Sequence, residues 1–241
     1  MNAAALHTAL RLGDDALILG QRLGEWCGHA PTLEIDLALA NFGLDLIGQA
    51  QHFLGYAGEL EANGRGADKL AFHRDVLDFT NCLLVEQPNG DFAQTIARQF
   101  LFSNWQELLF DQLAHSSDSR LAPIAAKAVK EVAYHARFAS DWVVRLGDGT
   151  DESRARMTAG LDWMWRFTGE LFEDLGPLID APALRPAWDA RIDAALAEAG
   201  LPRPPQVRPV LGGRNGHHSE HLGHLLCAMQ FLPRTYPDAV W

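Results

Sequence analysis

The chain has 241 residues, of which 48% are hydrophobic, and its formal net charge at pH 7 is −11. A chain of this length and composition can bury one sizeable core. The negative charge and the lack of any run rich in lysine or arginine argue against electrostatic binding to nucleic acid or to an anionic membrane surface. Proteins and small molecules are therefore the expected partners.

The cysteines and the apolar segments bear on the compartment of the protein. Cys27, Cys82 and Cys227 are odd in number, far apart and outside any CxxC pair, which is typical of a reducing compartment. The first twenty residues lack a basic segment followed by an apolar core. The most apolar stretch, 37–50, contains Asp45 and falls short of the roughly 20 residues that span a bilayer. We predict a cytoplasmic protein without a membrane anchor.

Apolar residues recur at spacings of three and four through most of the chain, and strand signals are almost absent. The pattern predicts an all-α protein. Asp91, which follows Pro88-Asn89-Gly90, is the expected N-cap of the third long helix. The predicted helices, in chain order, are four long ones over 4–26, 32–61, 91–116 and 119–147, a short one over 68–84 after the second, and further ones over 152–175, 183–199 and 216–232.

The prolines predict extended backbone in the C-terminal part of the chain. Seven of the twelve lie between residues 177 and 209, and each restricts the residue before it to extended backbone. We expect one ferritin-like domain over 1–241: a core four-helix bundle over about 4–147, extra helices over about 152–199, a proline-rich arm over about 200–215 and a last helix over about 216–232.

A bundle of this kind can hold a di-metal carboxylate site, and the sequence can be searched for one. Such a site takes one carboxylate from each of two helices and a Glu-x-x-His pair from each of the other two. None of the ten histidines has Asp or Glu three residues before it. The third long helix offers no carboxylate between Asp91 and Glu107. We therefore predict no catalytic, cofactor-binding or metal-binding residue in this chain.

Four residues remain as candidates for a vestigial polar cluster. Gly48 follows Asp45 where a paired histidine would stand, and Tyr134 follows Glu131 in the same way. For the pair Glu131 and His135 we favour a hydrogen bond between them or to Lys127 or Lys130 over metal binding. The four candidates are Asp14, Asp45, Glu131 and His135.

The histidines near the C-terminus offer a second candidate metal site. His217, His221 and His224 have the spacing of one helical face, which zinc could use, although exposed histidines at a helix start are more often interface or solvated residues. No GxSxG elbow, phosphate-binding loop or dinucleotide fingerprint occurs, so hydrolase, NTPase and dinucleotide-binding functions have no support.

Several motifs resemble one family over nearly the whole chain. RLGEWCGHAPTLEIDLALAN at 22–41, LLVEQPNGDFAQTIARQ at 83–99, KEVAYH at 130–135, LGDGTDES at 146–153 and HxEHLG at 218–223 are similar to the C subunits of phenylacetyl-CoA epoxidases. The second motif is long and distinctive.

The resemblance implies a ferritin-like subunit of a multicomponent monooxygenase in aerobic phenylacetate catabolism. In that family a separate subunit carries the di-iron site, and the C subunit pairs with it and stabilises it without a metal of its own. The expected partners are therefore the catalytic di-iron subunit, a small bridging subunit and a reductase, with no cofactor in this chain.

Two alternatives stay open at this point. The first is an autonomous di-metal oxidase that combines Glu107 with the four vestigial candidates in an atypical ligand set. The second, a minor one, is a contribution to acyl-CoA binding by Arg203, Arg208 and Arg214 near the arm, which would meet the anionic phosphates.

Overall fold

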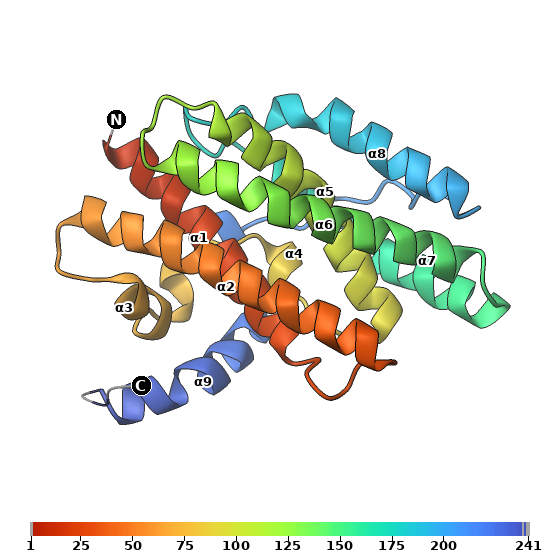
Figure 1. The fold of residues 1–241 in the computed structure, drawn as a ribbon, viewed down its shortest axis with the longest axis horizontal. Coiled ribbons are helices and arrows are strands. Elements are labelled where there is room, and N and C mark those ends of the chain that lie inside the picture. Colours follow the sequence, from red (N-terminus) through yellow and green to blue (C-terminus); the bar gives the residue numbers. More distant parts are fainter. Residues whose placement is uncertain (1, 238, 240–241) are drawn as a thin grey trace. The chain divides into compact units, whose positions relative to one another are not determined.

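The computed structural model describes residues 2–237 and 239, and no strand occurs among them. The predicted all-α class is confirmed (Figure 1), and its long helices are those of a ferritin-like helical bundle. The chain divides into two compact units: residues 1–88 together with 212–241 form unit 1, and residues 89–211 form unit 2. The single domain over 1–241 stays a prediction.

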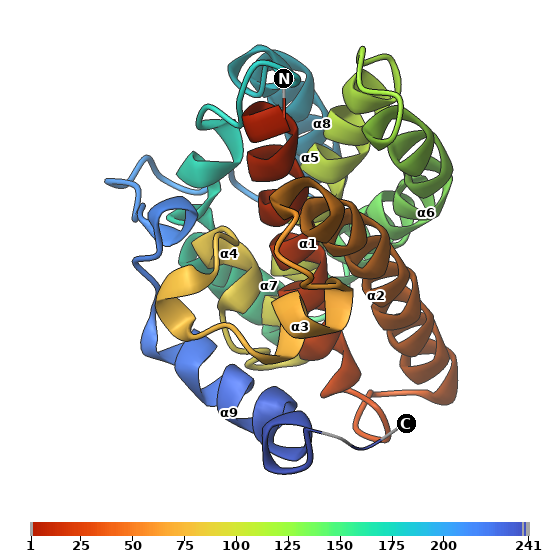
Figure 2. The same cartoon turned by 90° about the vertical axis from the view of Figure 1, so that its left-hand side faces the viewer.

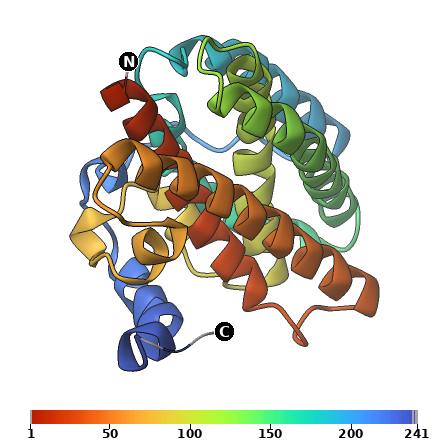
Figure 3. The same cartoon turned by 60° about the vertical axis from the view of Figure 1, so that its left-hand side comes forward.

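Unit 1 is built on a pair of long helices. Thr32 begins the second of them, because its side chain accepts a hydrogen bond from the backbone N–H of Ile35. The two long helices pack side by side along their length (Figure 3). The elements of unit 1 are α1 (Asn2–Gly24), α2 (Leu33–Glu61), α3 (Ala67–Phe72), the 3₁₀ turn η1 (Val76–Asp78), α4 (Leu83–Glu86), the 3₁₀ turn η4 (Gly213–Asn215) and α9 (Glu220–Thr235).

The C-terminal helix α9 belongs to unit 1 although it is far from α3 in the sequence. It packs against α3 and η1 (Figure 2). The prediction placed this helix over 216–232. Ser219 is in fact its N-cap, and the helix continues through Pro233 to Thr235. Gly216, with φ of 79°, ends the preceding turn in a left-handed conformation that favours glycine, so the backbone cannot be helical there.

Gly58 sits where α2 meets the loop that follows it. A Cβ atom added there would collide with the backbone oxygen of Arg65. Because backbone cannot move aside as a flexible side chain can, we expect Gly58→Ala to lower the free energy of unfolding by about 1–3 kcal/mol. Chemical denaturation of the two proteins measures the difference. An unchanged midpoint would show that the loop is not packed on α2 as described.

Unit 2 contains the other long helix pair. Its N-cap was predicted correctly: the Asp91 carboxylate accepts from the N–H of Gln94 at 2.9 Å. The first helix of the pair is buried along most of its length and packs against the second. The elements of unit 2 are α5 (Phe92–Ala114), α6 (Leu121–Gly147), α7 (Asp151–Trp165), the 3₁₀ turns η2 (Thr168–Phe172) and η3 (Pro182–Leu184), and α8 (Arg185–Glu198).

The helix predicted over 152–175 is wrong at its C-terminal end, because α7 stops at Trp165. The proline-rich arm explains the stop. The N–H of Val210 donates to the carbonyl oxygen of Arg166 at 2.9 Å, and a Cβ atom on Gly169 would lie 2.8 Å from Cβ of Pro209. The arm therefore occupies the space and the hydrogen-bonding group that another helical turn would need. Residues 201–212 are not helical, as the prolines predicted.

The helix predicted over 68–84 is also wrong. It breaks into α3, η1 and α4, with irregular backbone between them. The cause of this break lies in the candidate site, where backbone N–H groups of this segment bind buried carboxylates. Within the described residues, no helix is long and apolar enough to cross a membrane.

Candidate functional site

Two consecutive carboxylates of α1 are fully buried inside unit 1. Asp14 is one of the predicted candidates, and its two oxygens are both engaged. Oδ1 accepts from Nη2 of Arg74, and Oδ2 accepts from Nη1 of Arg74 at 3.0 Å. Oδ2 also accepts from the backbone N–H and the hydroxyl of Thr80, at 2.9 and 3.0 Å. The Arg74 guanidinium thus occupies the carboxylate oxygens that would have to be free to bind a metal ion.

Asp15, the next residue, faces a different partner because adjacent helical side chains diverge by about 100°. Its Oδ2 accepts from Nη2 of Arg214 at 2.7 Å, and its Oδ1 accepts from the backbone N–H of Cys82 at 2.8 Å. Burial raises the pKa of this carboxyl above its usual value, while Arg214 and Cys82 act in the opposite direction.

These two carboxylates explain why the helix predicted over 68–84 is broken. The backbone N–H groups of Thr80 and Cys82 point at Asp14 and Asp15. In a continuous helix, both N–H groups would be bonded to carbonyl oxygens one turn earlier. The irregular backbone therefore supplies donors to two buried anions that a helix would leave short of partners.

A third buried carboxylate lies in the short helix α4. Oε1 of Glu86 accepts from the N–H and the hydroxyl of Ser219, each at 2.7 Å. Oε2 accepts from Nδ2 of Asn81 at 2.9 Å and lies 2.7 Å from Nδ1 of His218. Ser219 and Asn81 therefore donate to opposite oxygens of the Glu86 carboxyl group.

His218 has a fully buried side chain between two acceptors. Its Nε2 lies 2.9 Å from the carbonyl oxygen of Phe79, which can only accept, so Nε2 carries a proton. Its Nδ1 meets the carboxylate of Glu86. His218 and Glu86 are thus in direct hydrogen-bond contact, with both side chains fully buried.

We call this set of residues the buried polar cluster. It joins segments of unit 1 that are far apart in the sequence: α1, the 73–82 segment, α4 and the residues before α9. Arg22 adds to it from α1, donating to the carbonyl oxygens of Glu86 at 2.8 Å and of His221 at 3.1 Å. The charged residues of the cluster bind one another and so hold the C-terminal segment of unit 1 in place. This arrangement is typical of a structural role. Its members are Asp14, Asp15, Arg74, Glu86, Arg214 and His218.

The other predicted candidates lie elsewhere. Asp45 is half-buried in α2 of unit 1. In unit 2, Glu131 is half-buried in α6 and His135 is fully buried. Tyr134, at the position of a paired histidine, is 47% exposed, so a histidine there would point largely to solvent. Lys127 and Lys130 are exposed, and the hydrogen bond between Glu131 and His135 stays a prediction.

The remaining candidate metal ligands are Glu107 and the C-terminal histidines. Glu107 accepts from Nη1 of Arg191 at 2.7 Å. His217 precedes α9, so it does not share a helical face with His221 and His224 as the spacing predicted. Among residues 2–237 and 239, no group of three or more His, Cys, Asp or Glu side chains could hold a metal ion.

The three arginines suggested for acyl-CoA binding differ in burial and in their ion-pair partners. Arg214 is buried against Asp15 and cannot meet a phosphate. Arg203 pairs with Asp189 and Asp193 of α8. Arg208 is exposed on the arm. The structure thus removes Arg214 from this set and leaves Arg203 already neutralised by carboxylates.

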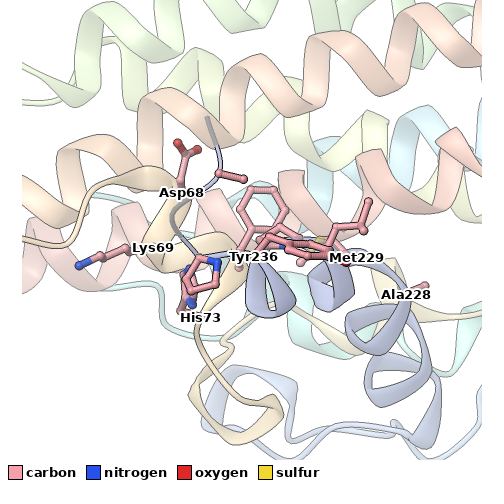
Figure 4. A pocket seen from close by; sticks show the side chains of 11 residues that line it. Asp68, Lys69, His73, Ala228, Met229 and Tyr236 are labelled. Atoms are coloured by element: carbon pink, nitrogen blue, oxygen red, sulfur yellow. The ribbon is translucent and has the colours of Figure 1, made fainter. Parts of the chain in front are cut away.

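One groove lies between α3 and α9, with a volume of about 540 Å³. Its walls are mostly apolar, with Phe72, Met229 and Leu232 among the lining residues, and Lys69 and His73 add polar groups (Figure 4). It contains none of the buried polar cluster. Its composition fits binding of an apolar group better than acid–base chemistry.

Comparison with known proteins identifies the family of the chain, which the geometry alone does not. The family model described as phenylacetic acid catabolic protein matches residues 1–241. The chain belongs to this family. One relative, the C subunit of the 1,2-phenylacetyl-CoA epoxidase of Escherichia coli (strain K12), is 51% identical over 250 residues, covering 100% of both chains. The resemblance predicted from the motifs is therefore confirmed.

The sequence indicated only part of this cluster. Asp14 was predicted as a vestigial carboxylate, whereas Asp15, Arg74, Glu86 and His218 were missed. A signal was present, since Glu86 is the only charged residue between 79 and 90. An isolated charge in an apolar stretch indicates a buried, partnered group, but it does not identify the partner.

Proposed function

We propose that this chain is a non-catalytic structural subunit of a phenylacetyl-CoA epoxidase. In this role it pairs with a di-iron catalytic subunit and stabilises it within a cytoplasmic monooxygenase complex of aerobic phenylacetate catabolism. A small bridging subunit and a reductase complete the complex. The observation that carries the proposal is the 51% identity to the C subunit of an epoxidase over the full length of both chains.

The chemistry of the carboxylates supports the absence of a catalytic metal in this chain. Asp14 is saturated by Arg74 and Thr80, and a buried guanidinium repels a cation at that carboxylate. Glu107 pairs with Arg191. A ligand set for two iron ions would have to displace both arginines, which makes an autonomous di-metal oxidase the weaker candidate.

Reconstitution of epoxidation tests the proposal. We expect turnover of phenylacetyl-CoA by the catalytic subunit and its reductase to require this chain, and this chain with the reductase alone to be inactive. The double variant Asp45→Asn/Glu131→Gln keeps the shape of two half-buried side chains and removes their charges. In the structural role we expect less than about a twofold change in kcat of the complex, because neither residue contacts a reacting atom.

The oxidase alternative predicts the opposite. If Asp45 and Glu131 were metal ligands, the double variant would lose its iron and its activity together. Full activity of the catalytic subunit in the absence of this chain would contradict the structural role directly.

A further inference from the structure

Helix α2 presents an apolar stripe on the side away from its packed face. Leu33, Leu37 and Leu44 are 70%, 56% and 70% exposed. At about 100° per residue these three side chains fall within about 40° of arc. The fully buried Phe42 and Leu46 lie on the opposite side of the helix. A helix that is apolar on both faces is normally covered on both.

Two glycines lie on the same arc further along α2, with the exposed Gln51 between them. Gly48 and Gly55 fall within about 60° of the same arc, and a Cβ atom on either would meet nothing within 4 Å. By contrast, a Cβ atom on Gly13 would lie 2.7 Å from Leu54. Glycine in a helix interior is less stable than alanine. Their position leaves bare backbone that a second helix can approach closely.

Most of the charges beside the stripe are negative. Glu34 and Glu59 flank it on one side and Asp36 lies towards the other, whereas Glu61 is paired with Arg65 at 2.7 Å. Helix α2 contains no lysine or arginine. Two copies of this face would set carboxylates against carboxylates, in a chain whose net charge is already −11. The face is complementary to an apolar surface rimmed by basic residues.

We infer that this outer stripe of α2, formed by Leu33, Leu37, Leu44, Gly48 and Gly55, docks a helix of the catalytic partner subunit. The docking helix has apolar side chains flanked by lysine or arginine. This inference rests on the proposed function, because it names the surface through which the proposed pairing takes place. The leucines supply apolar contact area, the glycines set the close approach, and the carboxylates select a basic partner.

Affinity for the purified catalytic subunit tests the inference. The variant Leu37→Arg/Leu44→Arg removes two apolar contacts and places cations against a basic rim. We expect its Kd to rise by about 100-fold or more. The matched control is Leu77→Arg, which alters a leucine that is 77% exposed on η1, and we expect its Kd to stay within about twofold of wild type. Circular dichroism verifies that both variants are folded.

The glycines give a readout that an effect on folding alone would not produce. We expect Gly48→Ala/Gly55→Ala to raise the Tm of the free chain by about 2–6 °C, because alanine favours the helix and meets no neighbour. The same variant weakens binding to the partner, since two methyl groups stand between the helices. Opposite signs for stability and affinity place the partner's backbone on this stripe.

The outcomes separate the inference from the proposed function. If the wild-type chain binds the catalytic subunit and Leu37→Arg/Leu44→Arg binds equally well, the surface is wrong and the pairing stands. If the wild-type chain does not bind at all, both are wrong. If sedimentation shows that the chain pairs with itself and Leu37→Arg/Leu44→Arg abolishes that pairing, the stripe joins two copies and the inferred basic partner is overturned.

Discussion

Replacing Arg214 with methionine lowers the free energy of unfolding of the free chain by about 3–5 kcal/mol. Methionine fills a similar volume, so the effect comes from leaving the carboxylate of Asp15 buried without its cation. Asp15 is 1% exposed, and the N–H of Cys82 alone does not replace the lost guanidinium. Urea denaturation monitored by circular dichroism measures the loss.

A second substitution and a control make this prediction specific. In the double variant Asp15→Asn/Arg214→Met the buried charge is gone, and we expect at least about 2 kcal/mol of stability to return. Arg203→Met removes a guanidinium from exposed ion pairs with Asp189 and Asp193 and is expected to lose less than about 1 kcal/mol. Equal losses for Arg203→Met and Arg214→Met, or additive effects in the double variant, would contradict a buried ion pair.

Glu86→Gln loosens the C-terminal segment of unit 1. The amide cannot accept from both Asn81 and Ser219, which donate to opposite oxygens of Glu86, because one of its two terminal atoms is itself a donor. We expect a loss of about 2–3 kcal/mol, concentrated in residues 217–235. Hydrogen exchange followed by mass spectrometry should show about 30- to 150-fold less protection of α9, with α1 and α2 nearly unchanged.

The control for this prediction is Glu220→Gln. This residue is exposed in the first turn of α9 and belongs to the same segment, but not to the cluster. It should leave exchange in α9 within about twofold of wild type. Uniform loss of protection across unit 1 in Glu86→Gln would show that the cluster supports the whole unit instead of holding its last helix.

Local signals in the sequence predicted the helices well. The periodicity located both long pairs, and Asp91 was correctly identified as an N-cap because it follows a turn and precedes a regular apolar pattern. Thr150, in the LGDGTDES motif, likewise caps α7 with a reciprocal bond to Ser153. Such contacts span three or four residues, so the sequence alone contains both partners.

Interactions between distant residues were not predictable in the same way. Asp15 pairs with Arg214, which is 199 residues away, and Glu86 with His218, which is 132 residues away. Nothing in the local pattern around Arg214 distinguishes a buried ion pair from an exposed linker residue, and the prediction as a phosphate ligand failed for that reason. The broken helix over 68–84 has the same origin, because its cause is the pair of carboxylates on α1.

Iron content is the most direct test of the claim that this chain supports a catalytic partner without a metal site of its own. The chain is purified alone and after co-expression with the di-iron subunit, and each sample is assayed for metal and for co-elution by size exclusion. The account predicts that the chain alone contains less than about 0.1 iron per molecule and is inactive, and that it co-elutes with an iron-bearing partner. Near-stoichiometric iron in the chain alone would contradict it and favour the oxidase.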